Sequence, residues 1–168
     1  PGRKSDVQES QWLMKLHTYG LLRNSFRPSQ EIRTMRTYWR QRNDLIRAAV
    51  SHIQRIQKAL TQMNIQLGNV LSDVSGVTGQ AILKAILAGE RDPHKLAALR
   101  DPRVKASEEQ IARYLEGNWQ EDLLFVLKQE QAGYEFCQQQ IAECDRQLEQ
   151  YLQLREDRSQ GASLPQEM

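Results

Sequence analysis

A long heptad pattern of apolar residues is the feature that most constrains the fold of this chain. Over residues 32–70, steps of three and four residues alternate through twelve positions, and among them only Arg42 is not apolar. A second pattern has nine positions over residues 123–151, where only Glu130 is charged. An apolar repeat of 3.5 residues keeps one seam of a helix facing a neighbouring helix. The two patterns therefore predict two long helices that pair along their apolar seams.

Helix-breaking and capping residues place several short helices between the two long ones. No Pro or Gly occurs between Ser29 and Leu67, so the first helix could extend about 58 Å at about 1.5 Å per residue. Ser29 is suited to cap this helix. Further along, Pro93 and the sequence Ser107-Glu-Glu-Gln110 indicate helix starts, and Gly89 indicates a helix end. No convincing β-strand alternation is present.

We therefore expect an all-α fold, in which two long antiparallel coiled-coil helices are joined by a small helical cap and preceded by a short N-terminal helix. The expected segments are an N-terminal segment 1–22, a linker 23–28, the first long helix 29–72, the cap 73–118, the second long helix 119–158 and a linker-like tail 159–168. The chain begins without Met and ends in this tail, so we expect it to be part of something longer.

The charge is unevenly distributed along the chain, although the net charge is only +2. Residues 1–60 contain twelve Lys or Arg and four Asp or Glu, a balance of +8, whereas the remainder has a balance of −6. A basic half favours a polyanionic partner.

Arginines recur on one side of the first long helix, at Arg33, Arg36, Arg40 and Arg47, with Arg42 and Arg55 nearby. Guanidinium groups at regular spacing along a helix suit contacts with phosphates. The alternative is a solvated face whose arginines pair with acids such as Glu31, Asp44 or those of the second helix. The sequence does not decide between the two.

Asp6 and Glu9 lie three residues apart near a helix start, so their carboxylates share a face. Two such acids can hold a divalent metal. The alternative is that they compensate the helix dipole. Cys137 and Cys144 lie seven residues apart on one seam and are expected to be reduced and buried. No Walker loop, Ser/His/Asp order, CxxC pair, signal peptide or membrane-spanning run is visible.

The segment Val74-Ser-Gly-Val-Thr-Gly79 faintly resembles a turn that offers backbone N–H groups to phosphate, although an ordinary turn between helices is the alternative.

Several strings of residues occur together in an order that resembles one family of proteins. They are Gly2-Arg-Lys-Ser-Asp6-Val-Gln-Glu9, Trp12-Leu13, Tyr19-Gly-Leu-Leu-Arg23-Asn-Ser-Phe-Arg-Pro28, Arg40-Gln-Arg42, Lys58-Ala-Leu-Thr-Gln-Met-Asn64, Asp73-Val-Ser-Gly-Val-Thr-Gly79 and Ala88-Gly-Glu-Arg-Asp-Pro93. Over residues 2–155 the set resembles the middle of the DEDD-type (RuvC-like) insertion-sequence transposases, which work with a structured bridge RNA.

The resemblance implies that residues 1–22 are the C-terminal end of a RuvC-like catalytic domain. The family has a Lys-Thr-Asp-x-x-Asp string there, which here reads Lys4-Ser-Asp6-Val-Gln-Glu9, so Asp6 matches the third of four catalytic acids and Glu9 replaces the fourth. The other two acids would precede this chain and a serine-bearing domain would follow it. Asp6 and Glu9 would then be catalytic residues that ligate Mg²⁺ in the parent protein.

The expected function is the central part of a bacterial, cytoplasmic transposase that binds DNA and structured bridge-type RNA and forms a homodimer or higher oligomer. Its nucleic-acid contacts would be Lys4, Arg33, Arg36, Arg40, Arg42, Arg47 and Arg55. We expect no membrane partner, and no catalysis by this chain alone. The alternative is a structural coiled-coil protein-interaction module whose arginines are solvated.

Overall fold

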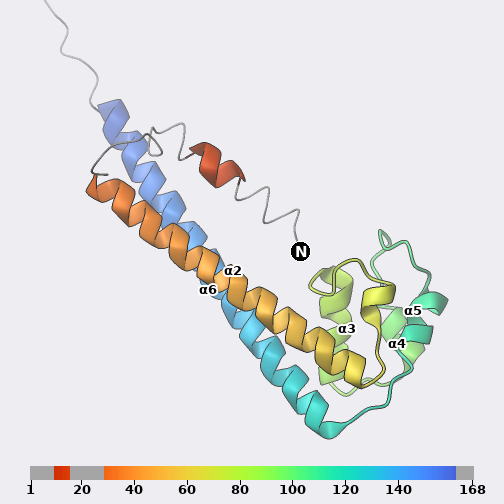
Figure 1. The fold of residues 1–168 in the computed structure, drawn as a ribbon. Coiled ribbons are helices and arrows are strands. Elements are labelled where there is room, and N and C mark those ends of the chain that lie inside the picture. Colours follow the sequence, from red (N-terminus) through yellow and green to blue (C-terminus); the bar gives the residue numbers. More distant parts are fainter. Residues whose placement is uncertain (1–9, 16–28, 162–168) are drawn as a thin grey trace, which may run out of the picture. The chain divides into compact units, whose positions relative to one another are not determined.

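The computed structural model describes residues 10–15 and 29–161, and all of its regular structure there is helical. A short helical stretch covers residues 10–15. The elements that follow are α2 (Gln30–Gln62), the 3-10 helix η1 (Leu67–Asn69), α3 (Val77–Leu87), α4 (Pro93–Ala97), α5 (Glu108–Tyr114) and α6 (Glu121–Gly161) (Figure 1). The long helices α2 and α6 pack together, and no strand occurs within the described ranges.

The chain divides into two compact units. Among the described residues, unit 1 contains 48–136, and unit 2 contains 10–15, 29–47 and 137–161. Each unit therefore contains one part of α2 and one part of α6.

Helix α2 begins where the sequence predicts, because Ser29 caps it. The Ser29 hydroxyl accepts from the Ile32 N–H at 3.4 Å, and its carbonyl accepts from the Arg33 N–H at 3.1 Å. The helix ends at Gln62, ten residues before the end of the segment expected at 72. There Asn64 has a φ of 60°, and the Ile65 N–H returns to the Leu60 carbonyl at 2.9 Å. Asn tolerates this left-handed conformation, which ends a helix without Gly or Pro.

The apolar seams point inward as their spacing predicts. None of the twelve positions of the first pattern and none of the nine of the second is exposed. The last two positions of the first pattern, Leu67 and Val70, lie beyond α2, yet they still contact the core of unit 1. The seam prediction is therefore confirmed for burial and for the pairing of α2 with α6.

The core of unit 1 packs the C-terminal turns of α2 against the short helices. Ile56, Leu60 and Met63 of α2 are at most 2% exposed and pack in one cluster with apolar residues of α3, α4, α5 and α6. Glycines permit two close approaches in this core. A Cβ on Gly79 would lie 2.6 Å from the Val74 carbonyl carbon, and a Cβ on Gly117 would lie 2.6 Å from an Ile65 side-chain carbon.

The short helices of unit 1 begin and end where Pro93, Ser107-Glu-Glu-Gln110 and Gly89 predict. Ser107 and Gln110 form a complete capping box at the start of α5. Asp92 caps α4, with Pro93 in its first turn. After α3, Gly89 has a φ of 106°, a conformation that a residue with a side chain rarely adopts. These three signals were read correctly from the sequence.

In unit 2, α2 and α6 run antiparallel. Glu31, near the start of α2, pairs with Arg155 near the end of α6, and Arg42, further along α2, pairs with the earlier residue Asp145. Trp12, Met35, Leu148 and Leu152 form its buried cluster. Beside them, the Tyr38 ring meets the Tyr151 ring edge-on, with centroids 6.4 Å apart.

No helix within the described residues combines the length and apolar character needed to cross a membrane.

Candidate nucleic-acid interface

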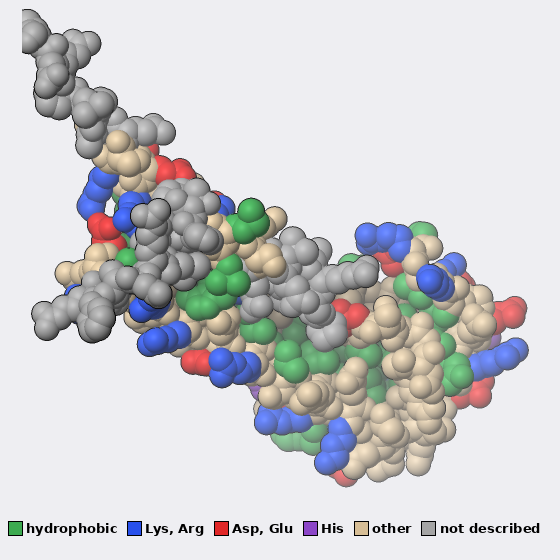
Figure 2. Space-filling model, turned by 45° about the horizontal axis from the view of Figure 1, so that its top comes forward, with side chains coloured by type: hydrophobic (Ala, Val, Ile, Leu, Met, Phe, Trp, Pro, Cys, Tyr) green, Lys and Arg blue, Asp and Glu red, His purple; other side chains and the backbone are tan. Residues whose placement is uncertain are grey.

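The candidate interface is a row of three arginines on the solvent side of α2. Arg33, Arg36 and Arg40 are exposed, and their spacing of three and four residues places them on one side of the helix. None of the three forms an ion pair with a residue that the structure describes. On the face of the molecule in Figure 2, Lys and Arg side chains and Asp and Glu side chains both reach the surface. We call these three residues the arginine row.

Of the acids expected as alternative partners, Glu31 pairs with an arginine of α6, whereas Asp44 pairs with Arg47, as that alternative predicts. Glu31 receives Arg155 of α6, whose Nε lies 3.3 Å from its carboxylate. Asp44 lies 3.6 Å from Arg47, and both side chains are largely exposed. Arg47, at 78% exposure, therefore stays accessible beside a carboxylate. No described carboxylate neutralises the positive charge of the arginine row.

Arg42 does not belong to this interface, and its prediction as a nucleic-acid contact is wrong. Its side chain is 1% exposed, and its Nε donates to Asp145 Oδ1 of α6 at 2.6 Å. The guanidinium also lies 5.7 Å from the centroid of the Trp39 ring. A buried guanidinium with a carboxylate partner holds α2 and α6 in register and is not available to a phosphate.

Arg55 is accessible but already has a partner. Its side chain is 59% exposed, and its Nη1 lies 3.5 Å from Glu130 Oε2. The same carboxylate oxygen lies 2.5 Å from His52 Nδ1. Hydrogen bonding to His52, aided by the charge of Arg55, lowers the pKa of the Glu130 carboxyl below its usual value. The His52 ring lies against Gly133, where any side chain would collide with it.

The two polar breaks in the apolar seams are thus both ion-pair positions. Arg42 interrupts the first seam and pairs with Asp145, and Glu130 interrupts the second and pairs with Arg55 beside its hydrogen bond to His52. Sequence reasoning noticed the breaks but not their partners. The available signal was that a charge within an apolar seam requires an opposite charge on the facing helix.

The long helices carry opposite charge. Helix α2 has seven Lys or Arg against two Asp or Glu, a balance of +5, and α6 has nine acids against four bases, a balance of −5. The basic surface predicted from the sequence is therefore a property of α2, and α6 presents an acidic one.

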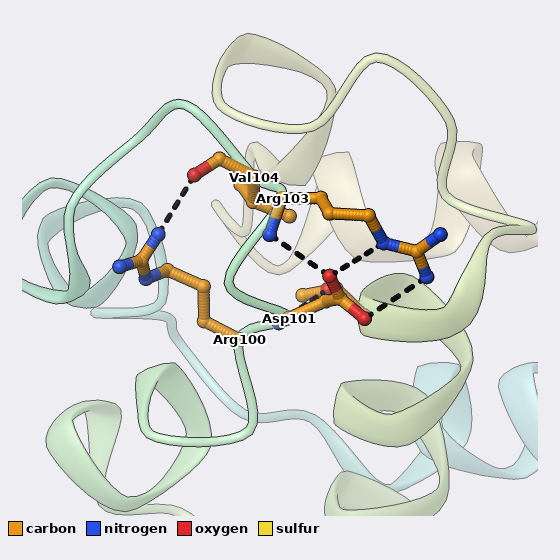
Figure 3. Close-up of polar contacts among 5 residues, drawn as sticks. Arg100, Asp101, Arg103 and Val104 are labelled. Carbon is orange, nitrogen blue, oxygen red and sulfur yellow. Dashed lines mark hydrogen bonds and ion pairs between the residues drawn. The ribbon is translucent and has the colours of Figure 1, made fainter.

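One carboxylate of unit 1 is strongly perturbed, at Asp101. The backbone N–H and the guanidinium of Arg103 converge on it, with distances of 2.9, 3.0 and 3.2 Å, while Arg100 turns to the Val104 carbonyl (Figure 3). The Arg103 hydrogen bonds lower the pKa of Asp101 to about 2. The Asp101 N–H donates to Thr78 Oγ1 at 3.0 Å, so this cluster ties its loop to the start of α3. Both of its carboxylate oxygens accept hydrogen bonds from Arg103.

The residues expected to hold Mg²⁺, Asp6 and Glu9, lie outside the described residues, as does Lys4. Among the residues that the structure does describe, no three His, Cys, Asp or Glu gather closely enough for a metal ion. Cys137 is buried and Cys144 half-buried, and both are free thiols. Burial raises the pKa of the Cys144 thiol. The Val74–Gly79 segment forms a turn and the first residues of α3.

Comparison of this chain with protein-family models, with curated proteins and with solved structures gives no match.

Proposed function

We propose that this chain is the helical, nucleic-acid-binding segment of a DEDD-type transposase, and that it binds the phosphate backbone of a structured RNA or of DNA along α2. The observation that carries the proposal is the arginine row, whose three side chains are exposed and lack an acidic partner among the described residues. The family itself rests on the resemblance of the sequence strings given above.

The chemistry of the arginine row is that of backbone recognition. Each guanidinium that neutralises a phosphate releases counterions, so affinity falls with salt, and three contacts contribute about −2 to −3 to the slope of log K against log salt. Such contacts give affinity and orientation without reading bases. Arg47 extends the row by about two turns, over a total axial length of about 21 Å. Arg42 has no part in it.

In the parent protein, Asp6 and Glu9 would supply two of the carboxylates that hold Mg²⁺, which activates the attacking group and stabilises the leaving oxygen during strand exchange. With two candidate acids this chain alone is inactive. The proposal also includes coiled-coil packing of the two seams and self-association in the parent.

The test is fluorescence anisotropy of the whole chain with a labelled RNA hairpin and with duplex DNA over a salt series. The triple variant R33E/R36E/R40E should lose about a hundredfold or more in affinity at low salt and most of the salt dependence. The matched control K128E/R146E/R158E makes the same charge change on α6 and should lose much less. Equal loss in both variants would show that only net charge matters, and wild-type binding by R33E/R36E/R40E would refute the proposal.

A second candidate function, a protein-interaction module, has one observation in its favour. Helix α6 exposes the large apolar side chains Phe125 and Phe136, which are 62% and 58% exposed and lie eleven residues apart on one side. Exposed aromatic side chains favour protein contacts. Sedimentation of F125S/F136S against the wild type separates the two functions: loss of self-association with normal RNA binding would assign this surface to protein contacts alone.

A further inference from the structure

Unit 1 contains a hollow between η1 and α5. A hydrogen bond of 3.2 Å from the Gln66 N–H to the Tyr114 carbonyl holds its two sides together. Its volume is about 520 Å³, within the range of small-ligand sites. It is lined by Asn69, Val70, Lys105, Ala106, Gln110, Arg113 and Tyr114.

The charged groups of this hollow are all positive. Lys105 and Arg113 line it, no carboxylate does, and neither cation forms an ion pair with a described residue. The sequence of α5 keeps its acidic residues away from the hollow. Its buried side carries Ile111 and Ala112, and the residues of its acidic first turn, Glu108 and Glu109, do not line the hollow. The hollow is therefore suited to an anion.

An aromatic ring distinguishes the hollow from a simple anion site. Tyr114 is 38% exposed, follows Arg113 in the chain and lines the hollow with it. A phenol ring beside two cations can stack on a planar base while the cations hold a phosphate. Inorganic phosphate or an acidic peptide would leave the ring unused.

We propose that this hollow binds a nucleotide, with Lys105 and Arg113 on its phosphate and Tyr114 against its base. The bound nucleotide would be an unpaired nucleotide of a single strand, and this assignment rests on the proposed function. A free nucleotide offers the same chemistry. The hollow is separate from the arginine row, which belongs to unit 2.

The experiment is an amide NMR titration of the whole chain with AMP, with inorganic phosphate and with a single-stranded tetranucleotide. Chemical shifts should change in residues 69–70 and 105–114. The double variant K105A/R113A should weaken AMP binding about tenfold or more. Tyr114→Leu should weaken AMP about fivefold or more while leaving phosphate binding unchanged, and Tyr114→Phe should bind AMP as the wild type does. Tighter binding of the tetranucleotide than of AMP would identify a strand as the source, and equal binding a free nucleotide.

The control K95A/K128A removes two cations elsewhere in unit 1 and should stay within about twofold of the wild type. R33E/R36E/R40E should also bind AMP normally, so a failure of the arginine row and a failure of the hollow are distinguishable. Three results would overturn the proposal: no shift changes around the hollow at about 10 mM AMP, undiminished binding by K105A/R113A, or phosphate binding as tightly as AMP.

Discussion

Replacing Gly79 by Ala tests the closest backbone approach in the core of unit 1. Gly79 lies in the first turn of α3, directly against the backbone of Val74. An added Cβ would lie 2.6 Å from the Val74 carbonyl carbon and 2.8 Å from its Cα, and nearer still to its oxygen. Contacts under 3.0 Å are not tolerated, and the obstacle is backbone, which cannot rotate away as a side chain can. Val74 is also 2% exposed, so it moves only by disturbing the core.

The expected cost follows from two opposing terms. Overpacking of a close-packed core costs about 3–4 kcal/mol when the backbone must shift, at and beyond the upper end of the usual range. Ala is preferred over Gly within a helix by about 1 kcal/mol, which offsets part of this cost. The net loss is about 2–3 kcal/mol, equivalent to a decrease in Tm of about 4–12 °C for a protein of this size.

The assay is urea denaturation followed by far-UV circular dichroism, with Gly68→Ala as the matched control. A Cβ on Gly68 meets nothing within 4 Å, so its substitution should change the free energy of unfolding by less than about 0.5 kcal/mol. Both substitutions restrict the unfolded chain equally, so their difference contains only the contact and the helix preference of Ala at residue 79. If Gly79→Ala is as stable as Gly68→Ala, the argument from backbone approach is wrong.

Three further predictions concern polar contacts within the units. Asp145→Ala should lower the free energy of unfolding by about 2–4 kcal/mol in urea denaturation, because it leaves the guanidinium of Arg42 buried without this carboxylate. The double variant R42M/D145L should recover most of the loss, and a loss below about 0.5 kcal/mol for Asp145→Ala would contradict the importance of the pair. Gly133→Ala should destabilise the wild type, because its Cβ would lie 2.7 Å from His52 Nε2. In the His52→Ala variant the same substitution should stabilise by up to about 1 kcal/mol, because Ala is preferred over Gly in a helix, and a double-mutant cycle without coupling would refute this. Asp101 has a folded-state pKa of about 2 against 3.8 for the free side chain, so its contribution to stability is present above about pH 4 and is lost as the pH falls towards 2. Asp101→Asn should remove this part of the pH dependence in urea denaturation from pH 2 to 5, and an unchanged profile would contradict the prediction.

Short-range signals predicted the local structure well. The Ser29 cap, the capping box at Ser107 and the helix end at Gly89 each depend on one or two neighbouring residues, so the sequence contains all the information needed. The end of α2 was missed because Asn64 adopts a left-handed conformation without Gly or Pro to announce it. The buried Ile65 that follows makes this turn favourable, and its burial depends on the rest of unit 1.

The candidate interface was only partly predictable. Helical spacing placed Arg33, Arg36 and Arg40 on one side, and they are exposed there. Spacing also placed Arg42 within the apolar seam, which faces α6, but it did not identify Asp145 as the partner that makes Arg42 unavailable to a phosphate. The hollow with Lys105 and Tyr114 was not foreseen, since its walls come from segments more than thirty residues apart.

The sequence by itself determined that this chain forms two long helices with buried seams, because a helix fixes the direction of each side chain from its spacing alone. It also determined where charge accumulates. Only the tertiary structure decided which charges remain available, since a partner such as Asp145 for Arg42 lies about a hundred residues away. Pairing and desolvation depend on distances between helices, and these distances are set by packing and not by order along the chain.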